Sequence, residues 1–190
     1  WQRRKDDEEF LGWLELSEVR DALGMRSHFV AVVNDITDKK RAEQELRYLA
    51  NFDTLTGLPN RALLSERLGR AIVRARRQET RVAVLFLDLD RFKDINDSMG
   101  HAAGDRLLKA AAARLQATVS AADTVARLGG DEFTMILEDV AGLGAVERTA
   151  REILIAFTTP LELDERHDVS ITPSLGISLY PDHALLPTDL

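Results

Sequence analysis

The chain has 190 residues, 45% of them hydrophobic, which leaves room for one full globular domain and part of another. Its net charge of −7 argues against a nucleic-acid backbone as the main partner, because duplex binding normally rests on a basic surface. The absence of cysteine excludes disulfides and thiolate metal sites. No apolar run approaches a membrane span and no signal-peptide pattern opens the chain, so we expect a cytoplasmic segment without membrane contact of its own.

Two strands and a helix are predicted in the first 50 residues. Residues 10–20 and 27–35 are expected to be strands, the second because apolar side chains alternate in HFVAVV, and a turn ending at Gly24 joins them. Thr37 or Asp38 can cap a helix through residue 49 with one narrow apolar stripe. Such a stripe suits a coiled-coil partner or packing on the helix's own domain, and so short a seam does not decide between them.

A second helix and a buried strand follow. Asn60 can cap a helix that runs to about Arg77, supported by a surface pair of Glu66 with Arg70. The arginines near its end are best explained as a solvated face that favours the helix dipole. The apolar run VAVLFL at 82–87 is long enough for a strand buried on both faces, and it ends in Asp-Leu-Asp.

The rest of the chain mixes helices with strands. We expect a helix from about 103 to 117 with an apolar core-facing stripe, a hairpin at 124–138 and a helix near 145–157. Apolar segments around Leu161 and at 169–180 are expected to be strands. This order predicts a mixed α/β domain.

Two glycines and two carboxylates stand at the tip of the predicted hairpin. Gly129 and Gly130 favour a tight primed turn, which requires positive φ, and their missing side chains let a ligand approach the backbone. If the sheet brings this tip beside the end of strand 82–89, Asp131 and Glu132 meet Asp88. Magnesium is bound by such open carboxylate sites together with substrate phosphates, so the pattern predicts a metal–phosphate site.

Four motifs carry a family resemblance: DTLTGLPNR at 53–61, FLDLDRFKDIND at 86–97, GHAAGD at 100–105 and RLGGDEF at 127–133. Together they resemble the GGDEF domain family, whereas a lone Gly-Gly-Asp-Glu would most often be an ordinary turn. The resemblance runs from about residue 49 to the end. It implies a bacterial diguanylate cyclase, which condenses two GTP molecules into cyclic di-GMP and releases two pyrophosphates. The implied fold is ferredoxin-like, related to nucleotidyl cyclases and polymerase palms, with a mostly antiparallel central sheet flanked by helices.

The resemblance assigns the acids to two metal ions, Mg²⁺ or Mn²⁺, in each active half-site. Asp88 would bind both ions, Leu89 would offer its backbone carbonyl, and Asp131 and Glu132 would complete the ligands. Two cations about 3.5–4 Å apart can orient a 3′-hydroxyl and stabilise charge that develops on the phosphates. The family also casts the acid at Asp131 as a proton acceptor. An ordinary aspartate pKa of about 3.9 makes it a weak base, so we expect metal ligation to come first.

The same resemblance assigns the nucleotide to neighbouring residues. Lys93 and backbone amides near Phe92 would contact the phosphates, with a plain surface lysine as the alternative. Asn96 and Asp105 would recognise guanine, since an amide pairs with the purine carbonyl and a carboxylate accepts from the ring N–H and the amine. Alternatively, Asn96 is a turn residue and Asp105 favours the positive end of its helix. His101 would lie beside the nucleotide or fix its loop. The backbone of Gly129 and Gly130 would also contact the nucleotide. Leu58 and Leu108 would flank the base or belong to the core.

The resemblance also divides the chain into three segments. Residues 1–36 resemble the carboxyl-terminal strands of a PAS sensor domain, 37–50 a signalling helix, and 51–190 the GGDEF domain. A PAS domain has about a hundred residues, so we expect the natural protein to begin well upstream, with room there for a membrane attachment. Similar domains continue with a helix of basic residues that hold phosphates, and the chain ends at Leu190, before that helix.

The resemblance finally implies partners and regulation. Catalysis would require a homodimer, because each GTP-loaded copy supplies one half of a two-fold site. The alternative is a regulatory GTP-binding module that controls an attached cyclic di-GMP phosphodiesterase domain, since metal and GTP binding need the same acids. Many members carry an inhibitory Arg-x-x-Asp site just before the signature. Here those positions are Ser120, Ala121, Ala122 and Asp123, so we expect little product inhibition through that site.

Overall fold

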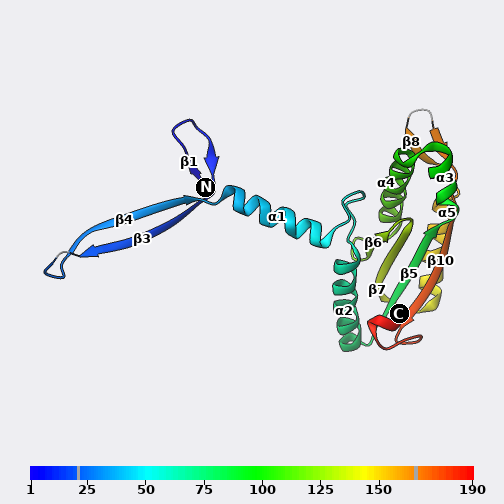
Figure 1. The fold of residues 1–190 in the computed structure, drawn as a ribbon. Coiled ribbons are helices and arrows are strands. Elements are labelled where there is room, and N and C mark those ends of the chain that lie inside the picture. Colours follow the sequence, from blue (N-terminus) through cyan, green and yellow to red (C-terminus); the bar gives the residue numbers. More distant parts are fainter. Residues whose placement is uncertain (21, 165–166) are drawn as a thin grey trace. The chain divides into compact units, whose positions relative to one another are not determined.

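The structure, a computed structural model, describes residues 1–20, 22–164 and 167–190 and separates into two compact units, Trp1–Tyr48 and Leu49–Leu190 (Figure 1). The division falls inside helix α1 (Thr37–Asn51). No helix in the described residues combines the length and apolarity that a bilayer crossing needs.

The first unit contains two small antiparallel sheets. β1 (Gln2–Arg3) pairs with β2 (Glu9–Phe10), and β3 (Gly12–Arg20) pairs with β4 (Arg26–Asp35). The strand predicted at 10–20 is thus split, because Leu11 leaves the ladder and its N–H donates to the Thr37 hydroxyl at 2.8 Å. The strand predicted at 27–35 is confirmed.

The β3–β4 ribbon leaves apolar side chains uncovered. The predicted turn at Gly24 connects the two strands, and Gly24 has a φ of 76°. Asp21, which was also expected in this turn, lies outside the described residues. Trp13, Leu16 and Phe29 are 62%, 63% and 59% exposed. A two-stranded ribbon is at best marginally stable alone, so these side chains call for a further layer.

Helix α1 covers the residues for which the sequence predicts a helix. Its start differs from the prediction, because the Asp35 carboxylate, and not Thr37 or Asp38, accepts a hydrogen bond from the first helical N–H at 2.9 Å. Hydrogen bonds from Thr37, and then from Arg4, lower the pKa of Asp35 below its usual value.

The second unit begins with α2 and continues through a sheet with flanking helices. Its elements are α2 (Arg61–Gln78), β5 (Arg81–Leu89), α3 (Phe92–Met99), α4 (His101–Thr118), β6 (Thr124–Gly129), β7 (Glu132–Val140), α5 (Leu143–Ala156), β8 (Leu161–Asp164), β9 (His167–Val169), β10 (Pro173–Tyr180) and a 3-10 turn (Pro187–Asp189). Most predicted elements are confirmed. The helix expected from residue 103 begins two residues earlier, and α3 is an additional helix that the sequence analysis did not predict.

The central sheet has the order β10–β5–β7–β6, and every neighbouring pair is antiparallel. The order along the chain, strand, helices, two strands, helix, strand, is that of a ferredoxin-like fold. The predicted fold class is therefore confirmed. β8 and β9 form a separate hairpin between α5 and β10.

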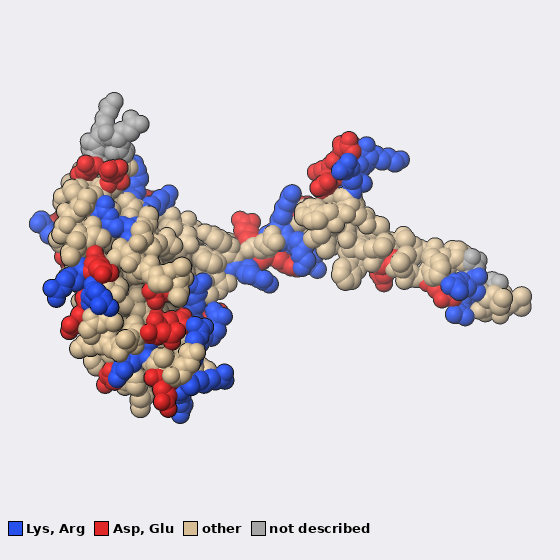
Figure 2. Space-filling model, turned by 180° about the vertical axis from the view of Figure 1, so that it is seen from behind, with Lys and Arg blue, Asp and Glu red and all other residues tan. Residues whose placement is uncertain are grey.

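Both faces of this sheet are covered, as the apolar run at 82–87 predicts. Leu85 and Leu87 of β5 pack on one face with buried residues of α4 and α5, whereas Val82 and Val84 pack on the other with α2 (Figure 1). The second face is open near the end of β5, where Phe86 is 45% exposed. Basic and acidic side chains are interspersed over the face of this unit seen in Figure 2.

The Asn60 cap predicted from the sequence is confirmed and also ties α2 to the preceding helix. Its Oδ1 accepts from the N–H groups of Ala62 and Leu63 at 3.0 and 3.2 Å, and its Nδ2 donates to the Ala50 carbonyl at 3.0 Å. Both ends of the side chain are thus used.

Asn60→Ala is expected to lower the free energy of unfolding by about 1–2 kcal/mol, because it leaves helical N–H groups without their acceptor. Urea denaturation of the purified chain measures the loss. The matched control is Glu66→Ala, which breaks an exposed 3.4 Å pair with Arg70. That control should change stability by less than about 0.5 kcal/mol. Equal losses in the two variants would contradict the capping role.

Candidate active site

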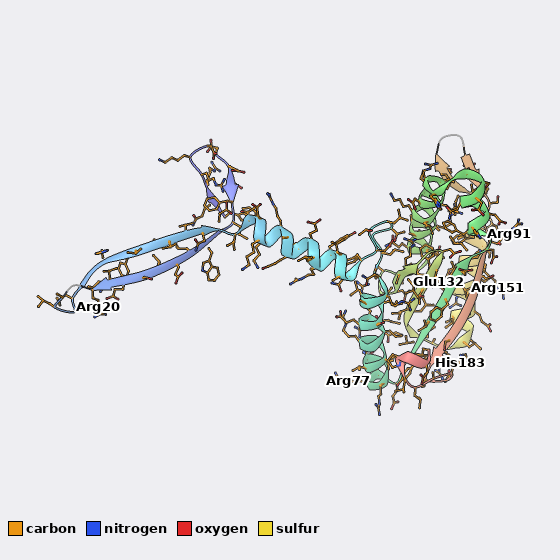
Figure 3. The ribbon with its side chains drawn as sticks, in the orientation of Figure 1. Arg20, Arg77, Arg91, Glu132, Arg151 and His183 are labelled. Carbon is orange, nitrogen blue, oxygen red and sulfur yellow. The ribbon has the colours of Figure 1, made fainter. Side chains whose placement is uncertain are left out.

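The acids predicted to meet lie at one end of the central sheet, where β5 ends and β7 begins. β5 and β7 pair so that Asp88 stands opposite Glu132, and Figure 3 shows Glu132 on this sheet. The β6–β7 hairpin closes Gly129 against Glu132, so Asp131 lies in the two-residue turn between them. The pairing of these strands therefore places all three carboxylates at the same end of the sheet.

The two glycines of this hairpin tip have backbone angles that favour glycine. Gly129 and Gly130 have φ of 142° and 53°, and Asp131 is not among the residues with positive φ. A Cβ at either glycine would meet nothing within 4 Å. Backbone conformation, not lack of space, thus requires glycine here, and the open space leaves the turn accessible to a ligand.

The carboxylates repel one another across the edge. Burial, and then the charges of Asp131, Glu132 and Asp90, raise the pKa of Asp88 above its usual value. An oxygen-only cluster of like charges fits a divalent cation, which would relieve the repulsion. Among the described residues no three His, Asp or Glu side chains converge closely enough to hold a metal by themselves. A metal here would need further oxygen ligands, such as a backbone carbonyl or a phosphate.

The two aspartates of the Asp-Leu-Asp sequence have different roles. β5 ends at Leu89, whose side chain is buried, so Asp90 lies beyond the strand. The hydroxyls of Ser174 and Thr172 donate to Asp90 at 2.6 and 2.7 Å and lower its pKa. Asp90 thus fixes the start of β10, whereas Asp88 is exposed at the edge.

The start of α3 presents the predicted phosphate contacts. Arg91 precedes the helix at a φ of 60°, and its side chain does not cap the helix but pairs with Asp94 in the first turn at 2.8 Å. Lys93 is exposed in the first turn, and Phe92 is buried beneath it. Free N–H groups at a helix start, together with a cation, favour an anion.

Asn96 and Asp105 lie on neighbouring helices in close contact. Asn96 is inside α3, so its alternative role as a turn residue is wrong. Its Oδ1 lies 2.0 Å from where a Cβ on Gly104 would be, which places the amide directly against α4 beside Asp105. α4 begins at His101, so Asp105 lies beyond the first turn, where the helix dipole acts weakly. The Asn96 side chain thus lies against Gly104, the residue before Asp105, and recognition of guanine by the pair stays a prediction.

The remaining candidates separate into exposed and buried residues. His101 is the first residue of α4 and is exposed. Leu58 and Leu108 are 0% and 3% exposed and belong to the main core cluster, as their alternative role predicts.

An open cavity of about 650 Å³ borders the acids on the α2 side of the sheet. Asp88, Glu132, Phe86, Arg61 and Ser174 are among its described lining residues. The predicted residues of α3 and α4 are not among its described lining residues.

Sequence reasoning missed a buried arginine behind the acidic tip. Arg127 donates to both carboxylate oxygens of Asp53 at 2.9 and 3.0 Å and to the Gly130 carbonyl at 3.0 and 2.7 Å. Both partners stand in motifs that carry the resemblance, but neither motif by itself indicates that they meet.

The positions of the inhibitory motif have a structural use here. The Asp123 carboxylate accepts from the backbone N–H groups of Ser120 and Glu138 at 3.0 and 3.1 Å, so it fixes this loop to β7. Nearby, Arg74 pairs with Glu138 of β7 at 2.6 Å. Arg74 is one of the arginines near the end of α2 that were expected to form only a solvated face, so this ion pair is an additional role.

The ferredoxin-like fold defines a palm-type α/β domain, and three carboxylates lie at one end of its sheet. Residues 50–190 match the family model described as "Diguanylate cyclase, GGDEF domain". Over 145 residues the chain is 44% identical to the diguanylate cyclase TpbB of Pseudomonas aeruginosa, covering 76% of this chain and 33% of TpbB. It is 48% identical over 145 residues to the bifunctional diguanylate cyclase/cyclic di-GMP phosphodiesterase MucR of the same organism, covering 76% and 21%.

The solved structure of the isolated TpbB GGDEF domain aligns with a TM-score of 0.71 at 45% identity, covering 73% of this chain and 81% of that one. The chain therefore belongs to the GGDEF diguanylate cyclase family, whose domains bind GTP, act as dimers and use divalent metal. It spans about a third of the length of TpbB and a fifth of MucR.

Asp88→Asn is expected to stabilise the metal-free protein by about 0.5 kcal/mol or less, because it removes one of three like charges that solvent partly screens. The folded-state pKa of Asp88 is raised, so ionised Asp88 lowers the stability of the wild type relative to Asp88→Asn. This difference in stability should disappear as the pH falls and the carboxyl group is protonated. Thermal melts at neutral and acidic pH measure both effects. Asp97→Asn, at an exposed position of α3, is the control, and an equal gain there would refute the repulsion.

Gly104→Ala is expected to weaken binding of a non-hydrolysable GTP analogue by about tenfold, or about 1.4 kcal/mol, because the new methyl group displaces the Asn96 amide. Calorimetric titration measures the affinity. Gly69→Ala in α2 is the matched control, since a Cβ there meets nothing within 4 Å. It should leave affinity unchanged and stabilise its helix by about 1 kcal/mol. Unchanged affinity in Gly104→Ala would argue against base recognition by Asn96.

Proposed function

We propose that this protein is a diguanylate cyclase that condenses two GTP molecules into cyclic di-GMP with release of two pyrophosphates. The observation that carries the proposal is the placement of Asp88, Asp131 and Glu132 at the same end of the paired strands β5 and β7. Family membership supports it, together with the named activities of TpbB and MucR.

In this proposal Asp88, Asp131, Glu132 and the Leu89 carbonyl hold two Mg²⁺ or Mn²⁺ ions in each half-site. The bound ions would supply Lewis-acid activation of a 3′-hydroxyl and charge neutralisation at the α-phosphate and pyrophosphate. The raised pKa of Asp88, caused by burial and then by the charges of Asp131, Glu132 and Asp90, supports this assignment, because a bound cation would offset both effects. Asp131, at the exposed turn, would take the proton of the hydroxyl only after that activation.

The chain's own residues would hold the nucleotide on the α3–α4 side of the acids. Lys93 and the free N–H groups at the start of α3 would bind the β- and γ-phosphates. Asn96 and Asp105 would bind the guanine edge, with His101 beside the nucleotide. The bare backbone of Gly129 and Gly130 would admit the substrate close to the tip.

Two copies would face each other in the active state. Each copy offers one nucleotide site, and a two-fold product needs two hydroxyls attacking two α-phosphates, so a homodimer is the smallest complete enzyme. This requirement makes the encounter of two loaded domains the step that regulation can act on.

The first unit is proposed to be the carboxyl-terminal part of a PAS sensor, followed by α1 as the signalling helix. Antiparallel pairing of β3 with β4 supports this, as do the exposed Trp13, Leu16 and Phe29, which a larger sheet domain would cover. The sensor would control how often two cyclase domains meet.

The second candidate is a GTP-binding module that regulates an attached phosphodiesterase. The relative MucR supports this second candidate, because its name records both a cyclase and a phosphodiesterase activity. It would use the same acids and guanine contacts without turnover.

The decisive experiment supplies the purified protein with GTP and Mg²⁺ and quantifies cyclic di-GMP, beside Asp88→Ala and Asp131→Ala. We expect product from the wild type and a loss of at least about 10²-fold in each variant, because each removes a metal ligand. Arg151→Ala, an exposed change on α5 (Figure 3), is the control and should be active. GTP binding without product, with the dimer established, would favour the regulatory module.

A further inference from the structure

Arg127 forms a double clamp behind the acidic tip. One end of its guanidinium donates to both oxygens of Asp53, and the other donates from Nε and Nη2 to the Gly130 carbonyl at 3.0 and 2.7 Å. The side chains of Arg127 and Asp53 are only 10% and 21% exposed. A planar guanidinium with both edges used in a shielded position fixes geometry more strictly than a surface ion pair.

Asp53 is itself held in place. The N–H and the hydroxyl of Thr56 donate to its Oδ1 at 2.9 and 2.6 Å. Its own N–H donates to the Leu58 carbonyl, and its carbonyl accepts from Gly57, both at 2.8 Å. Although burial opposes ionisation, the hydrogen bonds from Thr56 and then Arg127 lower the pKa of Asp53, so it remains a carboxylate at neutral pH.

The backbone reinforces the same connection. The N–H of Arg127 donates to the Pro59 carbonyl at 3.0 Å, which ties β6 to the segment 53–59. This is the first part of the DTLTGLPNR motif, which supplies none of the proposed metal, phosphate or guanine contacts. This segment holds Arg127 in place through the Asp53 carboxylate and the Pro59 carbonyl.

The tip needs such a support. Its two glycines have positive φ and open space around them, so side-chain packing does not hold the turn. The charges of Asp131 and Glu132 act against Asp88. In the described part of the chain no ion pair joins Arg127 to either tip acid, since Asp53 takes its charge. The arginine therefore fixes the peptide without acting as a counter-ion that a metal would have to displace.

We propose that Arg127, held by Asp53, is a positioning residue that fixes the peptide group preceding Asp131 and so aims the Asp131 and Glu132 carboxylates at Asp88. The Gly130 carbonyl belongs to the peptide plane shared with Asp131, so restraining that oxygen restrains the next residue's Cα. The catalytic consequence rests on the proposed cyclase function, whereas the restraint on the tip does not.

The test measures tip rigidity and turnover separately. Backbone ¹⁵N order parameters of Gly129 and Gly130 report the tip, and steady-state kinetics with GTP report catalysis. In Arg127→Ala and Asp53→Asn we expect the order parameters to fall from about 0.85 to below about 0.6 at the tip only. We expect kcat to fall by about 10²-fold with KM for GTP little changed, because the guanine contacts on α3 and α4 are untouched.

Two further variants separate positioning from folding. Arg127→Lys should fail to restore kcat, because an ammonium group cannot hold the carboxylate and carbonyl in one plane. Added guanidinium ion should partly restore Arg127→Ala, whereas methylammonium should not. Arg151→Ala is the exposed control and should match the wild type in every readout.

The outcomes are distinct. Tip order parameters equal to those of Arg151→Ala, or a loss of order spread through the whole domain, would overturn the proposal. Full activity of Arg127→Lys would also overturn it. If the wild type forms no product and the tip alone loosens in the variants, the positioning role stands and the proposed cyclase function fails.

Discussion

The pairing of β5 with β7 is the constraint on which the site depends. Their register sets Asp88 opposite Glu132, and the hairpin that begins β7 carries Asp131 to the same edge. A one-residue slip would turn every side chain of a strand to the other face, so the register is held by the core beneath it. Leu85 and Leu87 on one face and Val82 and Val84 on the other make a slip costly, since it would exchange two buried sets. Stability of the core and geometry of the acids therefore have one cause.

The acidic edge is an arrangement that folding alone does not favour. Burial, and then the charges of Asp131, Glu132 and Asp90, raise the pKa of Asp88, so its ionised form is disfavoured here. The turn beside Asp131 and Glu132 contains two glycines with positive φ, and glycine gives the backbone little rigidity. Arg127 resolves this conflict, because it restrains the tip from behind through a carbonyl and leaves the carboxylates open in front. The repulsion among the three carboxylates therefore lies at an open site, where a bound cation can relieve it.

The nucleotide side of the site depends on a close crossing of two helices. Gly104 lets α3 approach α4 until the Asn96 amide lies against the helix beside Asp105. A pair of side chains placed on two helices holds its geometry better than one placed on loops, and this pair is separate from the hairpin tip.

The sequence by itself determined most of the elements of the second unit. Apolar runs, glycine positions and the Asn60 cap predicted the strands, the hairpin and α2, because these depend on neighbours in the chain. The motifs indicated which acids to examine and which residues to propose for guanine recognition. Only the tertiary structure decided that Asp53 meets Arg127, that Asn96 lies against Gly104 and that Asp90 serves β10 through Ser174. Those partners are separated by up to 84 residues along the chain, and no local pattern encodes a contact that sheet order and helix crossing create.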